Sequence, residues 1–253
     1  MLRLFAIAWL FASTLAFAQP VAEIAPTGKL RAAINYGNPI LATKDANGQP
    51  QGVSVDLARA LGARIGVPVE LITFDSAGKV SSSVGLWDIA FLAIDPARAT
   101  EIAFTAPYVI IEGAYLVPAN SPIKSNDEVD RAGTRVVVGL GSAYDLFLTR
   151  ELKAATLVKA PTSPSVVDAM VAQNLDVSAG VKQQLEADAK RVPNMRLLPG
   201  RFMVINQAMG VPQGRPAAAA YVKQFVEDVK ASGFVAESLK RHRIEGAAVA
   251  PPN

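Results

Sequence analysis

Apolar runs alternate with amphipathic helical patterns along most of this chain. Residues 29–35 and 69–74 are predicted strands, and 53–66 is a predicted helix with its apolar residues on one stripe. The almost wholly apolar run Trp87–Ala93 is typical of a strand covered on both faces. This order predicts a β-α-β unit and therefore a sheet flanked by helices.

The same rhythm recurs in the second half of the chain. Strands or extended segments are predicted at 108–117, 134–140, 176–179 and 202–211, and helices at 142–152, 164–172, 181–190 and from Pro216 to Gly233. We therefore expect two α/β units. Residues 247–253 contain two prolines and are expected to form a flexible tail.

One arginine follows the apolar strand closely. Asp95 and Pro96 are predicted to be the N-cap and first residue of a helix, which places Arg98 in the first turn at the carboxyl end of the strand. Open α/β sheets bind ligands at that edge, and a guanidinium meets a carboxylate with two charge-assisted hydrogen bonds. The alternative is a surface arginine paired with Glu101, and the residues alone favour neither interpretation.

The N-terminus indicates export. Residues 1–3 carry a positive charge, 4–15 are apolar, and Ala16-Phe17-Ala18 has the pattern of a signal peptidase site, so we predict a signal peptide over 1–18. The chain has no cysteine, which rules out a lipid-anchored cysteine, a disulfide framework and a cysteine nucleophile. Export without an anchor predicts the periplasm, with no direct membrane insertion.

Composition excludes several function classes. The chain has 253 residues, is 51% hydrophobic and carries a net charge of +3, which is typical of a globular protein rather than a disordered one. Only residues 240–243 form a basic cluster, which we interpret as a solvated helix end rather than a nucleic-acid site. Gly139 and Gly141 begin a dinucleotide-binding pattern, but Tyr144 replaces its third glycine. We expect no cofactor and no metal.

A series of short motifs resembles family 3 of the bacterial extracellular solute-binding proteins, the periplasmic binding proteins of polar amino-acid ABC transporters. The resemblance covers about residues 28–244. The motifs are Gly28–Arg31, Gly48 and Gly52 before Val55–Leu61, Pro96–Arg98 with Phe104–Tyr108, and Val138–Ser142.

The resemblance implies an α/β fold of the type II periplasmic-binding-protein class. Each lobe is then a mixed sheet flanked by helices, and crossover strands form the hinge. Lobe 1 would comprise 26–112 plus 206–246, and lobe 2 would comprise 113–205. The implied function is capture of a small carboxylate by lobe closure, with an ABC permease as partner and a monomeric state.

The resemblance also implies which residues bind the ligand. Arg98 would hold the α-carboxylate, and Gly141, Ser142 and Ala143 would contact the same group at a helix start, where backbone N–H groups are free. Alternatively, Ser142 only caps its own helix. The further candidates are Tyr36, Asn38, Phe74, Ala93, Gly180 and Gln207.

Two departures from the family pattern concern the ligand. The aspartate that usually accepts the ligand's α-ammonium is missing near Gly180, and Asn38 stands where an aromatic residue commonly stacks, with Tyr36 nearby. A buried ammonium without a partner is costly. We therefore expect a carboxylate without an α-amino group, or one whose amine is held differently.

Two other functions use the same fold. One is a periplasmic enzyme, such as a lyase resembling cyclohexadienyl dehydratase, which would need a positioned acid or base. Glu112 is the one acid that we would test as catalytic, because the sole histidine, His242, lies in the C-terminal helix. The other is a ligand-sensing subunit. We expect a binding protein and assign no catalytic residue.

Overall fold

The structure is a computed structural model that describes residues 20–253, so the predicted signal peptide lies outside the described residues. The strands are β1 Leu30–Asn35, β2 Thr43–Lys44, β3 Pro50–Gln51, β4 Val69–Phe74, β5 Ile89–Ala93, β6 Ile102–Pro118, β7 Arg135–Gly139, β8 Thr156–Ala160, β9 Val177–Val181, β10 Met195–Leu197, β11 Met203–Pro212 and β12 Ala248–Val249. The α-helices are α2 Val53–Ile65, α3 Ala77–Ser81, α4 Pro96–Ala99, α5 Ala143–Glu151, α6 Val166–Ala172, α7 Lys182–Arg191, α8 Pro216–Ala231 and α9 Phe234–Arg241. Two short 3-10 helices are η1 Asn126–Glu128 and η2 Ser163–Ser165.

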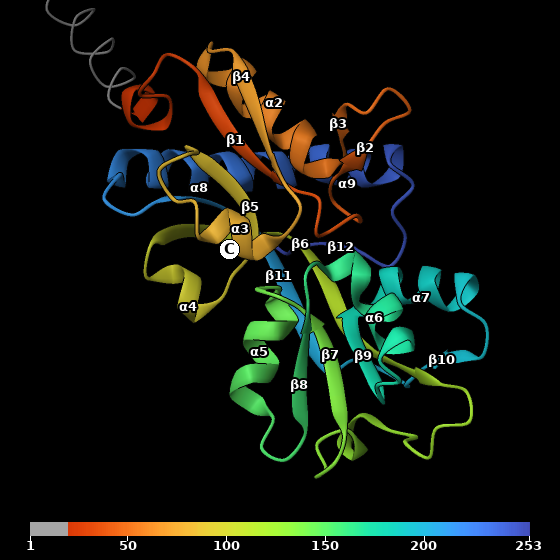
Figure 1. Cartoon of the computed structure of the whole chain (residues 1–253). Coiled ribbons are helices and arrows are strands. Elements are labelled where there is room, and N and C mark those ends of the chain that lie inside the picture. The colour runs from red at the N-terminus through yellow and green to blue at the C-terminus, as the bar shows by residue number, and fades with distance from the viewer. Residues whose placement is uncertain (1–19) are drawn as a thin grey trace, which may run out of the picture.

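The elements form two α/β bodies that meet at a narrow waist (Figure 1). We call the body with β1 to β5, α2 to α4, α8 and α9 lobe 1, and the body with β7 to β10 and α5 to α7 lobe 2. The main sheet has the strand order β4-β1-β5-β11-β6-β9-β7-β8, so it passes through both lobes. The long strands β6 and β11 pair with each other across the waist, from Ile102 with Pro212 to Gly113 with Met203.

Each lobe combines parallel and antiparallel pairing. In lobe 1, β1 is parallel to β4 and β5, and β5 is antiparallel to β11. In lobe 2, β7 is parallel to β8 and β9, and β9 is antiparallel to β6. Strand β5 is buried at every position, as expected for a strand covered on both faces. The mixed α/β fold predicted from the sequence is confirmed.

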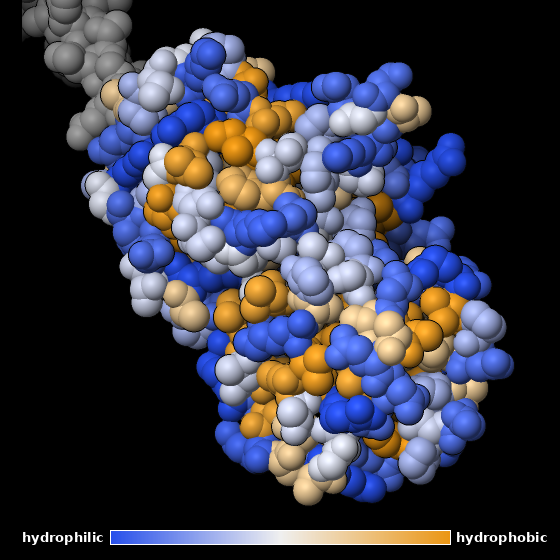
Figure 2. Space-filling model, in the orientation of Figure 1, coloured by the Kyte–Doolittle hydropathy of each residue, from blue (hydrophilic) through white to orange (hydrophobic). Residues whose placement is uncertain are grey.

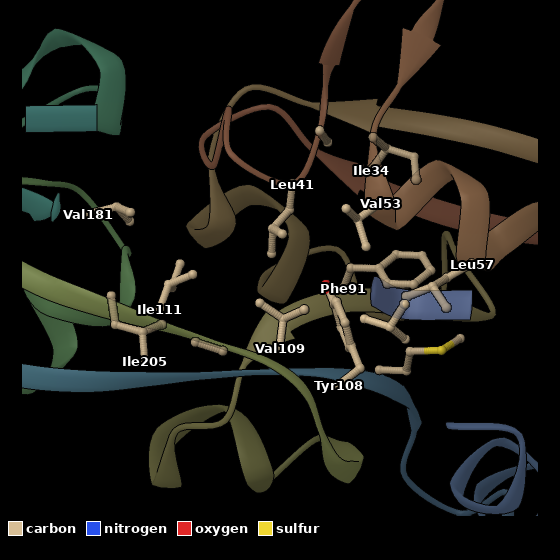
Figure 3. Packing of buried hydrophobic residues seen from close by; sticks show 14 of the residues in the cluster. Ile34, Leu41, Val53, Leu57, Phe91, Tyr108, Val109, Ile111, Val181 and Ile205 are labelled. Atoms are coloured by element: carbon tan, nitrogen blue, oxygen red, sulfur yellow. The ribbon is translucent and has the colours of Figure 1, made fainter. Parts of the chain in front are cut away.

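Apolar packing continues from lobe 1 along the crossover strands. Figure 3 shows Leu57 and Phe91 packed beside Tyr108, and the row of side chains then extends through Val109 and Ile111 along β6. These residues are at most 2% exposed. The middle of β6 is therefore anchored in the core that continues from lobe 1.

The C-terminal segment differs from the flexible tail predicted from its prolines. Strand β12 pairs antiparallel with β6 beside the waist, through Ala248 with Ile110 and Val249 with Val109. Ala250 donates its backbone N–H to the carbonyl of Tyr108 and is 3% exposed. The segment is ordered because β12 pairs with an edge of β6. The composition of residues 247–253 could not indicate this pairing.

The surface is mixed in character. On the face in Figure 2, apolar residues occur in small patches interrupted by hydrophilic ones. Within residues 20–253, no helix combines the length and the apolar character that a membrane span requires.

A buried carboxylate ties three elements of lobe 1 together. Asp88, just before β5, is fully buried and accepts hydrogen bonds from the backbone and side chain of Arg31 on β1 and from Arg215 at the start of α8. Burial alone would raise the pKa of Asp88, but these hydrogen bonds outweigh it and hold the pKa below its usual value. Ionised Asp88 therefore stabilises the fold.

We predict that Asp88→Asn lowers the free energy of unfolding by about 3–5 kcal/mol at pH 7, because it leaves two arginines without their carboxylate. Urea denaturation measures this loss. The wild type should lose the same advantage as the pH falls from about 4 through the lower folded-state pKa, since the stabilisation needs the ionised form.

The control is Glu70→Gln, which removes an exposed partner 3.9 Å from Lys29 and should cost less than about 1 kcal/mol. Equal effects of the two substitutions would contradict the role given to Asp88.

Candidate functional site

Arg98 lies where β5 ends and α4 begins, at the boundary between the lobes. Asp95 caps the helix by accepting a hydrogen bond from the N–H of Ala97 at 2.9 Å, and Pro96 takes the first helical position. The side chain of Arg98 reaches lobe 2, and the residue is only 4% exposed. The predicted strand-to-helix turn thus delivers a buried guanidinium to the gap between the lobes.

The guanidinium of Arg98 bonds to both lobes. It donates to the carbonyl of Ala93 in lobe 1 and to the carbonyl of Gly141 in lobe 2, each at 2.8 Å. Its Nε is buried and has no hydrogen-bond partner within residues 20–253. Burial lowers the pKa of Arg98 to about 10, with nearby Asp95 acting in the opposite direction. The group stays charged at neutral pH, and no carboxylate of the described chain forms a salt bridge with it.

Asp95 is instead paired across the gap. Its carboxylate lies 2.9 Å from the guanidinium of Arg150 on α5, and the Asp95 side chain is only 5% exposed. This ion pair is a second bond between the lobes. Because Asp95 forms its ion pair with Arg150, it stabilises the charge of Arg98 only by longer-range Coulomb attraction.

Two glycines bring the lobe backbones into direct contact. A Cβ on Gly78 of α3 would lie 3.2 Å from the Cα of Gly141, and a Cβ on Gly141 would lie 2.6 Å from the Cα of Gly78. Gly141 also has a φ of 69°, in the left-handed region that favours glycine. The lobes can therefore meet in this arrangement only because both positions lack side chains.

Several polar groups in the turn after β7 are hydrogen-bonded to one another. Ser142 accepts a hydrogen bond from the N–H of Asp145 at 3.0 Å, and Asp145 accepts one from the N–H of Gly141 at 2.8 Å. Ser142 therefore caps α5, which is the alternative that the sequence left open. In the first turn of α5, Ala143 and Tyr144 present N–H groups that have no acceptor inside the helix.

A small cavity lies beside Arg98, with a volume of about 30 Å³. Its lining comes from both lobes and from the crossover strand β11. The lining residues are Asn35, Gly37, Asn38, Ala77, Ala93, Arg98, Ser142, Ala143, Tyr144, Ser163, Val181, Ile205 and Gln207. Among these described residues Arg98 is the only charged one.

Asn38 places a second unpaired polar atom at the cavity. The residue is 7% exposed, and its buried Oδ1 has no hydrogen-bond partner among residues 20–253. The loop after β1 fixes its backbone, since the N–H of Asn38 bonds to Asn35 and its carbonyl accepts from Leu41 and Ala42. Two of the residues that line the cavity thus contain a buried unpaired atom, the donor Nε of Arg98 and the acceptor Oδ1 of Asn38.

The structure brings most of the predicted ligand residues together. Those lining the cavity are Asn38, Ala93, Arg98, Ser142, Ala143 and Gln207. Gly141 lies behind them and accepts the hydrogen bond from Arg98.

Besides Gly141, three predicted residues lie outside the cavity lining. The ring of Tyr36 lies 5.4 Å from Nζ of Lys44. Phe74 packs beside the apolar cluster around Trp87. Gly180 lies one residue before the end of β9 and faces Leu185.

Other cavity residues were not predicted. Asn35 and Val181 are the last residues of β1 and β9, so the rule that ligands bind at the carboxyl ends of strands would have found them. Ser163 and Ile205 reach the cavity from η2 and β11, and no local motif marks them.

Glu112 is held in ion pairs beside the waist. It lies 2.7 Å from Arg201 and 3.1 Å from Lys182. The hydrogen bonds from Arg201 and Lys182 keep the pKa of Glu112 below its usual value, so the carboxyl is a poor proton donor at neutral pH. Within residues 20–253, no cluster of three or more His, Asp or Glu side chains could hold a metal ion.

Comparison with known structures identifies the architecture. The solute receptor for L-cysteine of Neisseria gonorrhoeae matches with a TM-score of 0.78 and 24% identity, over 89% of this chain and 94% of the other. A mutant of ArgBP from T. maritima matches with a TM-score of 0.76 and 18% identity, over 89% and 100%. The ancestral amino acid-binding protein AncCDT-1, a precursor of cyclohexadienyl dehydratase, matches with a TM-score of 0.74 and 22% identity, over 87% and 98%. At these identities the matches show the fold.

The type II periplasmic-binding fold predicted from the sequence is thereby confirmed. The sequence model of the bacterial extracellular solute-binding proteins, family 3, matches residues 30–243. The matched region contains both lobes, the crossover strands and Arg98. The chain therefore belongs to the family 3 bacterial extracellular solute-binding proteins.

Proposed function

We propose that this protein is the substrate-binding component of a periplasmic ABC importer, and that it captures a small carboxylate between its lobes. The observation that carries this proposal is the guanidinium of Arg98, which is 4% exposed, charged and, within residues 20–253, bonded only to two backbone carbonyls. A buried charge without an opposite charge is costly. A ligand carboxylate would supply that charge.

In the proposed mechanism, the arrangement described above is the closed form. An open form binds the carboxylate through Arg98. The lobes then rotate about β6 and β11 until the turn at Gly141 of lobe 2 contacts Arg98. We propose lobe boundaries at 26–112 plus 206–246 and at 113–205. The closed surface is then offered to an ABC permease in the inner membrane.

Localisation follows from the N-terminal sequence. We propose that residues 1–18 direct export and are removed, so that the protein works in the periplasm as a monomer. Membership of an extracellular solute-binding family supports this location.

A carrier fits this chain better than an enzyme does. The acid that chemistry would need at the waist, Glu112, is held ionised between Arg201 and Lys182. In the described lining of the cavity, every residue other than Arg98 is neutral. A sensing subunit would use the same ligand site, and its partner would be a receptor in place of a permease.

We predict that Arg98→Met weakens carboxylate binding at least tenfold, because each lost hydrogen bond to a charged group contributes about 1.5–3 kcal/mol. Isothermal titration of carboxylates selected by a thermal-shift screen measures this loss. The melting temperature of the ligand-free protein should not fall, since methionine fills the space of a charge that lacks a carboxylate partner.

The control is Arg59→Met, on the exposed side of α2, which should leave binding unchanged. Wild-type affinity in Arg98→Met would remove Arg98 from the site. Product formed from a bound carboxylate, and lost in Glu112→Gln, would favour the enzyme over the carrier.

We also predict that Gly78→Ala weakens ligand binding at least fivefold without lowering the melting temperature of the ligand-free protein. The added methyl group would press on Gly141 at 3.2 Å and on the Leu140 carbonyl at 3.3 Å, which opposes closure, whereas alanine suits a helix better than glycine. Titration and the ligand-induced decrease in radius of gyration by X-ray scattering measure the effect. Full compaction and unchanged affinity would show that the glycine contact does not limit closure.

A further inference from the structure

We propose that the cavity selects a small carboxylate of net charge −1 with a neutral hydrogen-bonding group beside the carboxylate, such as a 2-hydroxy acid, and that Asn38 makes it reject 2-amino acids. The proposal rests on the proposed function, since it takes Arg98 as the carboxylate partner. It concerns the second functional group of the ligand.

Charge balance in the cavity carries the first step. Arg98 contributes one positive charge, and none of the other described lining residues is charged. A 2-amino acid enters as a zwitterion, so its ammonium would leave one positive charge uncompensated in an enclosed space. A monocarboxylate with a neutral substituent leaves the cavity neutral, which avoids the cost of burying a net charge.

The carboxylates of Asp95 and Asp145, which are bonded through their backbones to the lining residues Arg98 and Ser142, do not change this balance. Asp95 lies 2.9 Å from Arg150, and Asp145 lies 3.1 Å from Lys159 while accepting a hydrogen bond from the N–H of Gly141. Both are engaged outside the cavity lining. Each is already neutralised by its basic partner, so neither brings an uncompensated negative charge for a ligand ammonium.

Asn38 carries the second step. Its Oδ1 is buried and unpaired, and the residue lines the same cavity as Arg98; a ligand hydroxyl would satisfy this acceptor with one neutral hydrogen bond. An ammonium could also donate to this oxygen, but a neutral amide brings no negative charge, so the excess positive charge of the filled cavity would remain. Because an amide can turn to present its N–H groups, a 2-oxo acid is a second ligand of the same charge.

The size of the cavity limits the rest of the ligand. Its volume of about 30 Å³ is a small fraction of the ~150 Å³ of an apolar cavity that holds benzene. The backbones of Gly78 and Gly141 are already in contact, so the lobes cannot be much closer. A ligand therefore enters only when the lobes lie somewhat further apart than here, and we expect the smallest acids, such as glycolate and lactate, because they need the least separation.

The test compares ligands of equal shape that differ only in hydroxyl and ammonium. Glycolate and both enantiomers of lactate are titrated against glycine and both enantiomers of alanine at pH 7.5, with wild-type protein and Arg98→Met. In the wild type the hydroxy acid should bind at least tenfold more tightly than the amino acid of the same shape, and Arg98→Met should abolish that binding.

The isosteric variant Asn38→Asp should reverse the preference. The added carboxylate leaves the cavity neutral with a zwitterion and negative with a hydroxy acid, so the affinity ratio should shift at least a hundredfold towards alanine and glycine. Val181→Asp places an acid at the end of β9 in the same lining and serves if Asn38→Asp fails to fold. The control is Asn120→Asp, which makes the same change in an exposed turn of lobe 2 and should alter neither affinity.

The outcomes separate the two proposals. Amino acids that bind the wild type more tightly than hydroxy acids, and lose affinity in Arg98→Met, would overturn the present inference and leave the proposed function standing. Binding of every acid unaffected by Arg98→Met would overturn the proposed function. An unchanged hydroxy-acid preference in folded Asn38→Asp would remove Asn38 as the selecting residue.

Discussion

The guanidinium of Arg98 is the constraint on which this account depends. A permanent charge is held at the boundary of the two lobes, 4% exposed, with one carbonyl partner in each lobe and a buried Nε left over. Folding alone does not neutralise this group. An anion that enters the gap would gain a charge-assisted bond and at the same time remove the cost of an unpaired cation.

The contacts around Arg98 also define how closely the lobes approach. The ion pair of Asp95 with Arg150 and the hydrogen bond from Arg98 to Gly141 draw lobe 2 towards α4. The backbone contact of Gly78 with Gly141 sets the limit of that approach. Attraction and steric limit act on the same turn, so the position of Gly141 couples ligand binding to lobe geometry in the proposed mechanism.

Short local sequence patterns predicted the main elements of the fold and the position of Arg98. The all-apolar strand and the Asp95-Pro96 helix start placed Arg98 correctly at the end of β5, because strand burial and N-capping are decided within a few residues. The short strands β8, β10 and β12 were not predicted. Strand β8 includes the polar residues Thr156 and Lys159, and β10 and β12 are only three and two residues long and pair with β6, far away in the chain. The partner carbonyl of Gly141 and the unpaired Oδ1 of Asn38 are long-range features that no spacing encodes.

The missing family aspartate gained meaning only from the structure. The sequence left open whether an amine is absent or is held differently. The structure adds that Asn38, with its unpaired neutral acceptor, lines the same cavity as Arg98 and that the described lining contains no acid. The meaning of a residue missing from a family motif therefore depends on the charges of the residues that line the site.

The central claim is that Arg98 binds the carboxylate of a ligand. A change in the ligand tests this claim without any change in the protein. Calorimetric titration of the wild type would compare a 2-hydroxy acid with its carboxamide, which keeps shape and hydroxyl but loses the charge. The account predicts at least tenfold weaker binding of the carboxamide. Equal affinity for the two would contradict it.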